Sequence, residues 1–182
     1  MKYFTKEMWL GWNSRDVGEQ QRADEQSKRN WLEYEQQLEE LQSRLGPEAY
    51  HFFKNEERHD GRLVAFTVGD AINYKVHGAL KFDINKHDTT VEIKLLGPQL
   101  DVLYTLNYKG IQRVIFDYPT DAPLFYREGD HIGDWGYDEV TAVDENYLRH
   151  EVLFSTGTTI LIEFKRFSYE REACEGTRYQ CL

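Results

Sequence analysis

The spacing of apolar residues divides the chain into a helical front and a strand-rich back. Between Gly18 and Leu45 the sequence is dominated by Gln, Glu, Lys and Arg and contains no proline and no further glycine. The apolar residues of this stretch follow a three-four spacing, which places them on one stripe of a helix. They are Trp31, Tyr34, Leu38, Leu41 and Leu45.

Gly46-Pro47 predicts the end of this helix, and Pro47–Phe53 a short second helix, because proline is tolerated in a first helical turn. The stripe spans only about two heptads, fewer than a coiled coil needs, so it favours packing against a core. An oligomeric structural protein that associates through residues 31–45 stays open as an alternative.

From Arg62 onward the hydrophobic period changes to two, which is typical of β-strands. Strands are predicted at residues 62–68, 80–84, 91–95, 102–108, 114–118, 136–143, 147–155 and 158–167. Thr156-Gly157 predicts a tight hairpin between the last two. Short connections favour antiparallel pairing. We therefore predict an α+β fold in which a helical N-terminal arm packs on an antiparallel sheet of about seven or eight strands.

The predicted organisation is a helical arm over residues 1–58, an antiparallel β domain over 59–170 and a C-terminal tail over 171–182. Both cysteines, Cys174 and Cys181, fall in the tail. A bridge between them would close a small loop outside the core and constrain little of the unfolded chain, so free thiols are expected.

Composition narrows the class of protein. The chain has 182 residues, of which 40% are hydrophobic and 14% aromatic, which predicts a folded body with a real core. No stretch approaches the roughly 18 apolar residues of a membrane helix, and the N-terminus has no apolar signal region. The basic residues form no patch, so neither nucleic acid nor membrane is expected as a partner. A cytoplasmic protein is predicted.

Negative charge is concentrated in residues 121–145, which hold eight acids and one base in a chain of net charge −10. Aromatic residues and glycines are interleaved with these acids. Such a segment repels nucleic acid and attracts basic protein surfaces. The segment therefore predicts a binding loop for a basic partner protein, in which an outward-facing indole is surrounded by carboxylates. The predicted binding residues are Asp130, Asp134, Trp135, Tyr137 and Asp138. The alternative is that the two aromatic residues pack on the sheet while the acids face water.

The same segment also contains residue types that can bind metals or act in catalysis. Asp130, His131, Asp134 and Asp138 offer oxygen and imidazole ligands, but their order does not fit a calcium-loop pattern. Asp134 and Asp138 could form a carboxylate pair, although nothing in their spacing singles them out for acid–base chemistry. We therefore predict no catalytic residue, no metal ligand and no cofactor. A metal-assisted hydrolase remains the alternative function.

Two His-Asp pairs, His59-Asp60 and His87-Asp88, each precede a predicted strand. Such a pair can orient an imidazole for catalysis or for metal binding. Asp and Asn next to glycine also form turns through bonds from side chain to backbone, and this interpretation is favoured for both pairs.

Three segments together resemble a family of uncharacterised bacterial proteins, a domain of unknown function. They are the opening heptapeptide Met1–Glu7, the turn Arg58–Leu63, and the run Trp135–Val140 followed by Tyr147–Phe164. The resemblance implies a bacterial cytosolic origin and no particular activity.

The function predicted is thus a non-enzymatic interaction module of bacterial origin. It would bind a basic protein, as immunity proteins mask basic toxin sites, and this comparison rests on charge and size alone. The sequence does not predict the oligomeric state.

Overall fold

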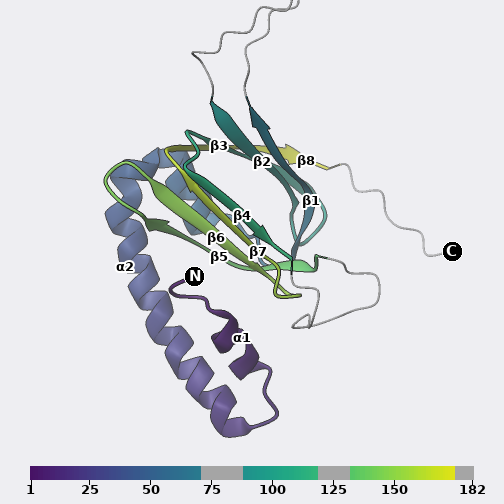
Figure 1. The fold of residues 1–182 in the computed structure, drawn as a ribbon. Coiled ribbons are helices and arrows are strands. Elements are labelled where there is room, and N and C mark those ends of the chain that lie inside the picture. Colours follow the sequence, from purple (N-terminus) through teal and green to yellow (C-terminus); the bar gives the residue numbers. More distant parts are fainter. Residues whose placement is uncertain (71–87, 119–131, 175–182) are drawn as a thin grey trace, which may run out of the picture.

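A computed structural model of the chain describes residues 1–70, 88–118 and 132–174. The elements occur in the order α1 (Lys6–Trp12), α2 (Val17–Asn55), β1 (Gly61–Asp70), β2 (Thr89–Leu96), β3 (Val102–Lys109), β4 (Arg113–Asp117), β5 (Asp134–Ala142), β6 (Leu148–Phe154), β7 (Thr159–Phe164) and β8 (Arg166–Ala173). Two helices pack on one eight-stranded antiparallel sheet (Figure 1), so the predicted α+β fold is confirmed.

Both helices begin at residues that cap free backbone N–H groups. The Thr5 hydroxyl accepts from the Met8 N–H at 3.3 Å, and the Asp16 carboxylate accepts from the Glu19 N–H at 2.9 Å. Gly46 has a φ of 75°, a left-handed conformation that glycine adopts readily, and it kinks α2 at the point where the sequence predicts the end of one helix and the start of another. The N-terminal half of α2 projects beyond the sheet with α1 packed along it (Figure 1).

The apolar stripe of α2 packs within the chain, as predicted. Tyr34, Leu38 and Leu41 are buried in the main hydrophobic core. Trp31, at the start of the stripe, remains 45% exposed. The Trp31 ring also lies 4.7 Å from the Phe4 ring, so one side of the indole packs within the chain while the rest is exposed. At the other end of the stripe Leu45 is partly buried.

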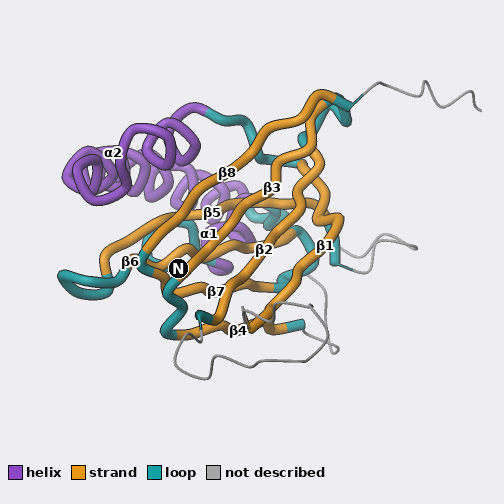
Figure 2. The backbone as a smooth tube through the Cα atoms, turned by 90° about the horizontal axis from the view of Figure 1, so that it is seen from above, coloured by secondary structure: helices purple, strands orange, loops and turns teal. Residues whose placement is uncertain are grey.

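The sheet curls because the β3–β8 ladder continues, after a bend, as the β4–β7 ladder. The β3–β8 ladder ends at Lys109 and Arg166, and the β4–β7 ladder starts at Arg113 and Glu163. Only a short bend separates the strands on each side, and on one side it is Lys165 alone. Since β7 pairs with β6, β6 with β5, and β5 with β1, the pairing leads from β1 around to β1 again (Figure 2).

The core fills the inside of this curl. Phe52 and Phe53 lie at the end of α2. Their ring centroids are 5.2 Å and 4.9 Å from that of Phe167 on β8, distances typical of packed aromatic pairs. The Tyr108 ring lies 5.2 Å from that of Phe164. The Phe53 ring also lies 5.0 Å from the His150 ring of β6, so the end of α2 contacts strands from both halves of the sheet.

The structure bears on three further predictions, which concern one strand, the C-terminal end of the sheet and membrane-spanning helices. The strand predicted at 80–84 lies outside the described residues. Strand β8 runs to Ala173, past the predicted domain boundary at residue 170, and Cys174 is a free thiol, whereas Cys181 is not described. Among the described residues, no helix is both long enough and apolar enough to cross a membrane.

The first His-Asp pair forms the predicted turn. Asp60 has a φ of 65°, and the Gly61 N–H donates to the Arg58 carbonyl oxygen at 2.9 Å. In the second pair His87 is not described, and the Asp88 carboxylate accepts the backbone N–H of Gly110 at 3.1 Å. The first pair therefore lies in a turn, whereas the turn predicted at the second pair lies mostly outside the described residues, and its Asp88 binds the bend between β3 and β4.

Candidate functional site

Four of the five predicted binding residues lie on β5, and the fifth, Asp130, lies outside the described residues. A bulge at Gly136 determines how the four are presented, because it shifts the register of β5 against β6 between Trp135 and Tyr137. In a regular strand these two aromatic residues would share a face. The bulge instead places Trp135 opposite Phe154 and Tyr137 opposite Leu153, on different faces of the sheet.

Trp135 is fully buried, which corrects the expectation of an outward-facing indole. Its ring lies 5.5 Å from that of Phe154, and its Nε1 donates to an Asp138 carboxylate oxygen at 2.9 Å. The indole faces inward because the bulge places it with the core residues of β6. A glycine inside a predicted strand is the sequence signal that could have indicated this bulge.

Asp138 is also directed inward, and its side chain is 6% exposed. Its carboxylate accepts from the Arg58 Nε at 3.1 Å and lies 3.1 Å from the His150 Nε2. Burial raises the pKa of Asp138, but the charge of Arg58 and the hydrogen bond from His150 outweigh burial and lower the pKa below its ordinary value. Asp138 is therefore an ionised, paired carboxylate of the interior and does not face a partner.

The chain of polar contacts continues from Asp138 to Tyr108. The His150 Nδ1 lies 2.7 Å from the Tyr108 hydroxyl, and both side chains are fully buried. With the Nε2 proton directed at Asp138, the Nδ1 of the imidazole accepts a hydrogen bond from the Tyr108 hydroxyl, so each of the three groups has a partner. Burial raises the pKa of Tyr108 well above its usual range, so the hydroxyl keeps its proton.

Arg58 joins this network to the end of α2. Its side chain is 9% exposed. The Arg58 Nη1 donates to the carbonyl oxygens of Phe52 at 2.5 Å and Glu56 at 2.8 Å. Carbonyl groups at a helix C-terminus lack intrahelical partners and favour a cation. The contiguous Arg58, Asp138, His150 and Tyr108 side chains, here named the buried network, thus hold α2 to the sheet. Because they are buried, they present no surface to a substrate.

The remaining carboxylates of β5 are separated rather than clustered. Glu139 is fully buried and accepts the backbone N–H groups of Tyr3 at 2.8 Å and Phe4 at 3.1 Å. Asp134 is partly exposed, and its carboxylate lies 3.5 Å from the Arg62 Nε. The described part of the predicted acidic loop is therefore not a single outward anionic surface, which corrects that expectation.

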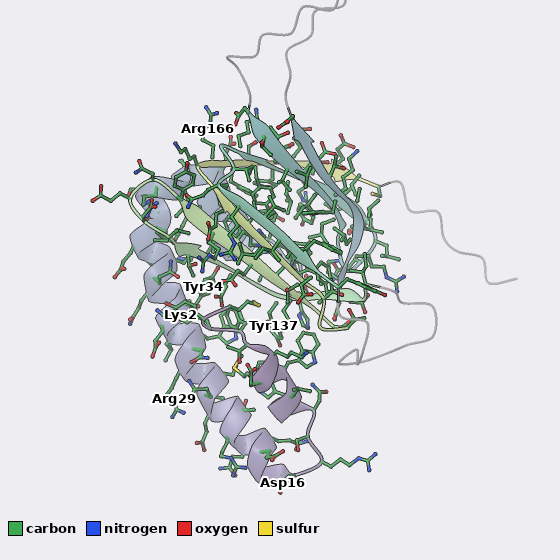
Figure 3. All side chains as sticks on the ribbon, viewed as in Figure 1. Lys2, Asp16, Arg29, Tyr34, Tyr137 and Arg166 are labelled. Carbon is green, nitrogen blue, oxygen red and sulfur yellow. The ribbon has the colours of Figure 1, made fainter. Side chains whose placement is uncertain are left out.

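Tyr137 lies on the outer face of the sheet, between α1 and the strands (Figure 3). Its ring is 5.5 Å from the rings of Phe4 and Trp12 and 5.4 Å from that of Trp9. Burial, with a further contribution from the charge of Asp60, raises the pKa of its hydroxyl. Tyr137 is thus half-buried in an aromatic cluster that holds α1 on the sheet.

An exposed indole beside carboxylates does occur, but on α2. The kink at Gly46 bends the end of α2 back, so that the Lys54 ammonium pairs with the Glu39 carboxylate. The bend encloses a hollow of about 170 Å³. We name the lining of this hollow the elbow surface; it consists of Trp31, Tyr34, Glu35, Leu38, Glu39, Phe53 and Lys54.

The elbow surface has the chemistry that the sequence analysis assigned to β5. Trp31 is 45% exposed, and Glu35 and Glu39 follow it by four and eight residues, so they lie on its side of the helix. Among the described residues Glu35 has no ion-pair partner, whereas Glu39 has Lys54. Sequence reasoning assigned Trp31 to the core, although the spacing of these acids was a usable signal.

No metal site occurs within the described ranges, because they contain no group of three or more His, Cys, Asp or Glu side chains that could hold an ion. Asp134 and Asp138 point to different surroundings, and Asp130 and His131 are outside those ranges. Nothing in the geometry favours the metal-assisted hydrolase over the interaction module.

Comparisons of the chain with protein-family models, with curated proteins and with solved structures each gave no match. The resemblance to a family of uncharacterised bacterial proteins therefore stays a prediction.

Proposed function

We propose that this protein is a non-enzymatic interaction module that binds a basic protein partner through the elbow surface of α2. The supporting observation is the exposed Trp31 indole at the rim of a hollow that also carries two carboxylates, of which Glu39 pairs with Lys54 and Glu35 has no ion-pair partner among the described residues. Tryptophan is enriched among the residues that dominate binding energy at interfaces. Carboxylates beside it favour a cationic partner and accelerate its approach.

The hollow suits the end of a lysine or arginine side chain. An ammonium or guanidinium group there would approach the face of Trp31, an attraction of about 0.5–2 kcal/mol, and would meet the unpaired Glu35. Residues 33–40 contain four glutamates and no base, so the local field is negative along this part of the helix. The overall charge of −10 acts in the same direction.

Affinity capture from source cells tests the proposal. The bait is the full chain in five forms: wild type, Trp31→Ala, Glu35→Gln, and the matched controls Leu32→Ala and Glu33→Gln. Leu32 is exposed on α2, and Glu33 is an exposed acid that does not line the hollow. We expect a basic protein that wild type and both controls retain, that Trp31→Ala loses, and that Glu35→Gln retains poorly.

Isothermal titration with the captured protein then gives magnitudes. Trp31→Ala should weaken binding by about 2 kcal/mol or more, which is roughly 30-fold. Raising the salt concentration should weaken binding by wild type more than binding by Glu35→Gln, because salt screens the exposed charge that the variant lacks. Equal affinities of wild type and Trp31→Ala, with the fold of both verified by circular dichroism, would contradict the proposal.

A further inference from the structure

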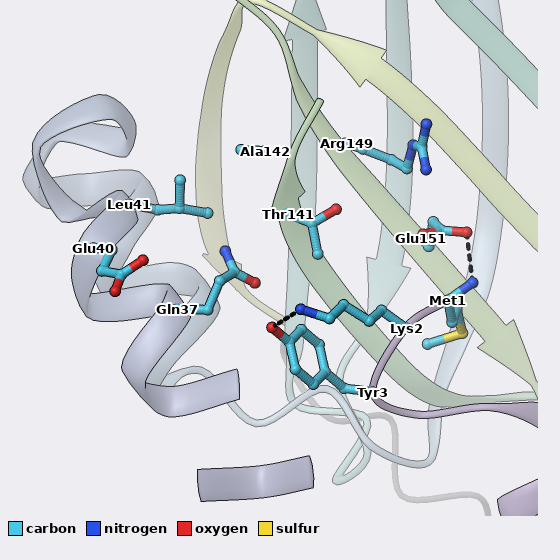
Figure 4. Close-up of a pocket in the computed structure, with 10 residues that line it drawn as sticks. All are labelled: Met1, Lys2, Tyr3, Gln37, Glu40, Leu41, Thr141, Ala142, Arg149 and Glu151. Atoms are coloured by element: carbon cyan, nitrogen blue, oxygen red, sulfur yellow. Dashed lines mark hydrogen bonds and ion pairs between the residues drawn. The ribbon is translucent and has the colours of Figure 1, made fainter. Parts of the chain in front are cut away.

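A second cavity, separate from the elbow surface, lies where α2, the N-terminal segment and the strands β5 and β6 meet (Figure 4). Its volume is about 420 Å³, within the range of pockets that hold small molecules. It is lined by Met1, Lys2, Tyr3, Gln37, Glu40, Leu41, Thr141, Ala142, Arg149 and Glu151.

Gln37 makes this cavity unusual. Its side chain extends from α2 toward Lys2 and Tyr3 (Figure 4). Both the Oε1 and the Nε2 of its amide are buried, and neither has a hydrogen-bond partner in the part of the chain that the structure describes. Leaving a buried polar group unsatisfied costs about 1–3 kcal/mol. An amide with an unused donor and an unused acceptor at a cavity wall points to a ligand that supplies both partners.

The charged groups of the cavity differ in whether they are already paired. The Met1 ammonium lies 2.7 Å from a Glu151 carboxylate oxygen, and Arg149 pairs with Glu163 outside the cavity at 2.7 Å. Two opposite charges remain. The Lys2 ammonium donates to the Tyr3 hydroxyl at 2.8 Å, and among the described residues no carboxylate lies within ion-pair distance of it, although the charges of Glu33 and Glu139 act on it from further away. Glu40 likewise has no ion-pair partner there.

One cation, one anion and a bifunctional amide are complementary to a molecule that carries both charges. We propose that the cavity binds a small zwitterion of the free amino acid type. Its carboxylate would meet the Lys2 ammonium and the Gln37 amide N–H, and its ammonium would meet the Glu40 carboxylate and the Gln37 amide oxygen. The buried Leu41, with Ala142 and the Met1 side chain, provides an apolar wall for the ligand's side chain.

The test measures thermal unfolding and isothermal titration with L-alanine, L-leucine and L-glutamine, on protein without an N-terminal tag. Propionate and propylamine each carry one of the two charges and serve as ligand controls. We expect at least one amino acid to raise the unfolding midpoint by about 5 °C when present at about 100 times its Kd. Each single-charge control should give a much smaller shift.

Two variants locate the binding. Gln37→Leu should weaken it by about tenfold or more while leaving the free protein at least as stable, because the change removes two unsatisfied polar atoms. Gln36→Leu, on the exposed side of α2, is the matched control and should bind as wild type does. Circular dichroism verifies that both variants are folded.

Three results would overturn the inference. The first is no shift with any of the three amino acids at about 20 mM, far above the Kd expected of a built site. The second is propionate or propylamine matching the amino acids, which would indicate a site for a single charge. The third is an unchanged Kd in Gln37→Leu, which would place the ligand elsewhere.

Discussion

Replacing Asp138 by Asn tests the role of the buried network. The carboxylate accepts from three side chains: Arg58 at 3.1 Å, Trp135 at 2.9 Å and His150 at 3.1 Å. Asparagine keeps the shape but removes the charge, and its amide N–H₂ replaces one acceptor with a donor. Arg58, which is 9% exposed, would then be a buried cation without its counter-charge.

Breaking a buried ion pair from one side destabilises a protein by about 3–5 kcal/mol. A loss of about 4 kcal/mol lowers the ratio of folded to unfolded protein roughly 1,000-fold, a large share of a typical stability of about 5–15 kcal/mol. Asp134→Asn is the matched control on the same strand. Asp134 lies 3.5 Å from an Arg62 side chain that is 60% exposed. This pair should contribute only about 0–1 kcal/mol.

Urea unfolding followed by tryptophan fluorescence measures both variants at pH 7. The pH dependence gives a second readout. The pKa of Asp138 is lower in the folded chain than its ordinary value of 3.8, so its ionisation favours the folded state above that value. This contribution is lost as the pH falls toward the folded pKa. The difference in the free energy of unfolding between wild type and Asp138→Asn should therefore become smaller as the pH is lowered from about 5.

A loss in Asp138→Asn that is within about 1 kcal/mol of the loss in Asp134→Asn would refute the reasoning, since it would mean that the inward carboxylate is not needed to balance Arg58. The double variant Arg58→Met, Asp138→Asn separates charge from shape. If the uncompensated charge is the cause, the double variant should be more stable than Asp138→Asn.

Three further substitutions have defined outcomes. Glu139→Ala should destabilise the fold by about 3 kcal/mol, because backbone N–H groups of the N-terminal segment lose their buried acceptor. Amide hydrogen exchange at residues 2–4 should become faster, and unchanged exchange would contradict this role. Gly136→Ala should lower the free energy of unfolding by about 1–3 kcal/mol in a urea titration, because its methyl group would overlap the Trp9 ring and the backbone carbonyl oxygen of Leu153. Wild-type stability would mean that both the ring and the bulge move to make room. Tyr34→Phe should lower the free energy of unfolding by about 1–3 kcal/mol, because the buried Val140 N–H loses its acceptor at 3.1 Å. An unchanged midpoint of thermal unfolding would show that another group replaces the hydroxyl.

The fold followed from periodicity, because periodicity reports which residues face a core. The three-four spacing of α2 and the period of two along β2 and β3 match the buried positions, including Tyr34 and Ile93. The turn at Gly46 was predicted because glycine and proline restrict the backbone locally. Strand β8 was only partly predicted, because it is mostly exposed and its charged residues weaken the alternation.

The candidate site was predicted less well, for two physical reasons. Charge density along the sequence does not show which carboxylates find internal partners, and Asp138 finds Arg58, 80 residues away in the chain. In addition, the bulge at Gly136 reverses the side-chain alternation, so Trp135 turns inward. Trp31 was assigned to the core by its helical spacing, yet as the first residue of the stripe it is 45% exposed and lines the elbow surface.

The capture of the N-terminal segment by Glu139 has a consequence for the order of folding. The amides of residues 3 and 4 join a carboxylate 136 and 135 positions later in the chain. During synthesis these first residues emerge long before their acceptor exists, and contacts across such sequence separations form slowly. We expect the amides of residues 3 and 4 to gain protection from hydrogen exchange during refolding no earlier than the amides of β5, because their acceptor lies on that strand.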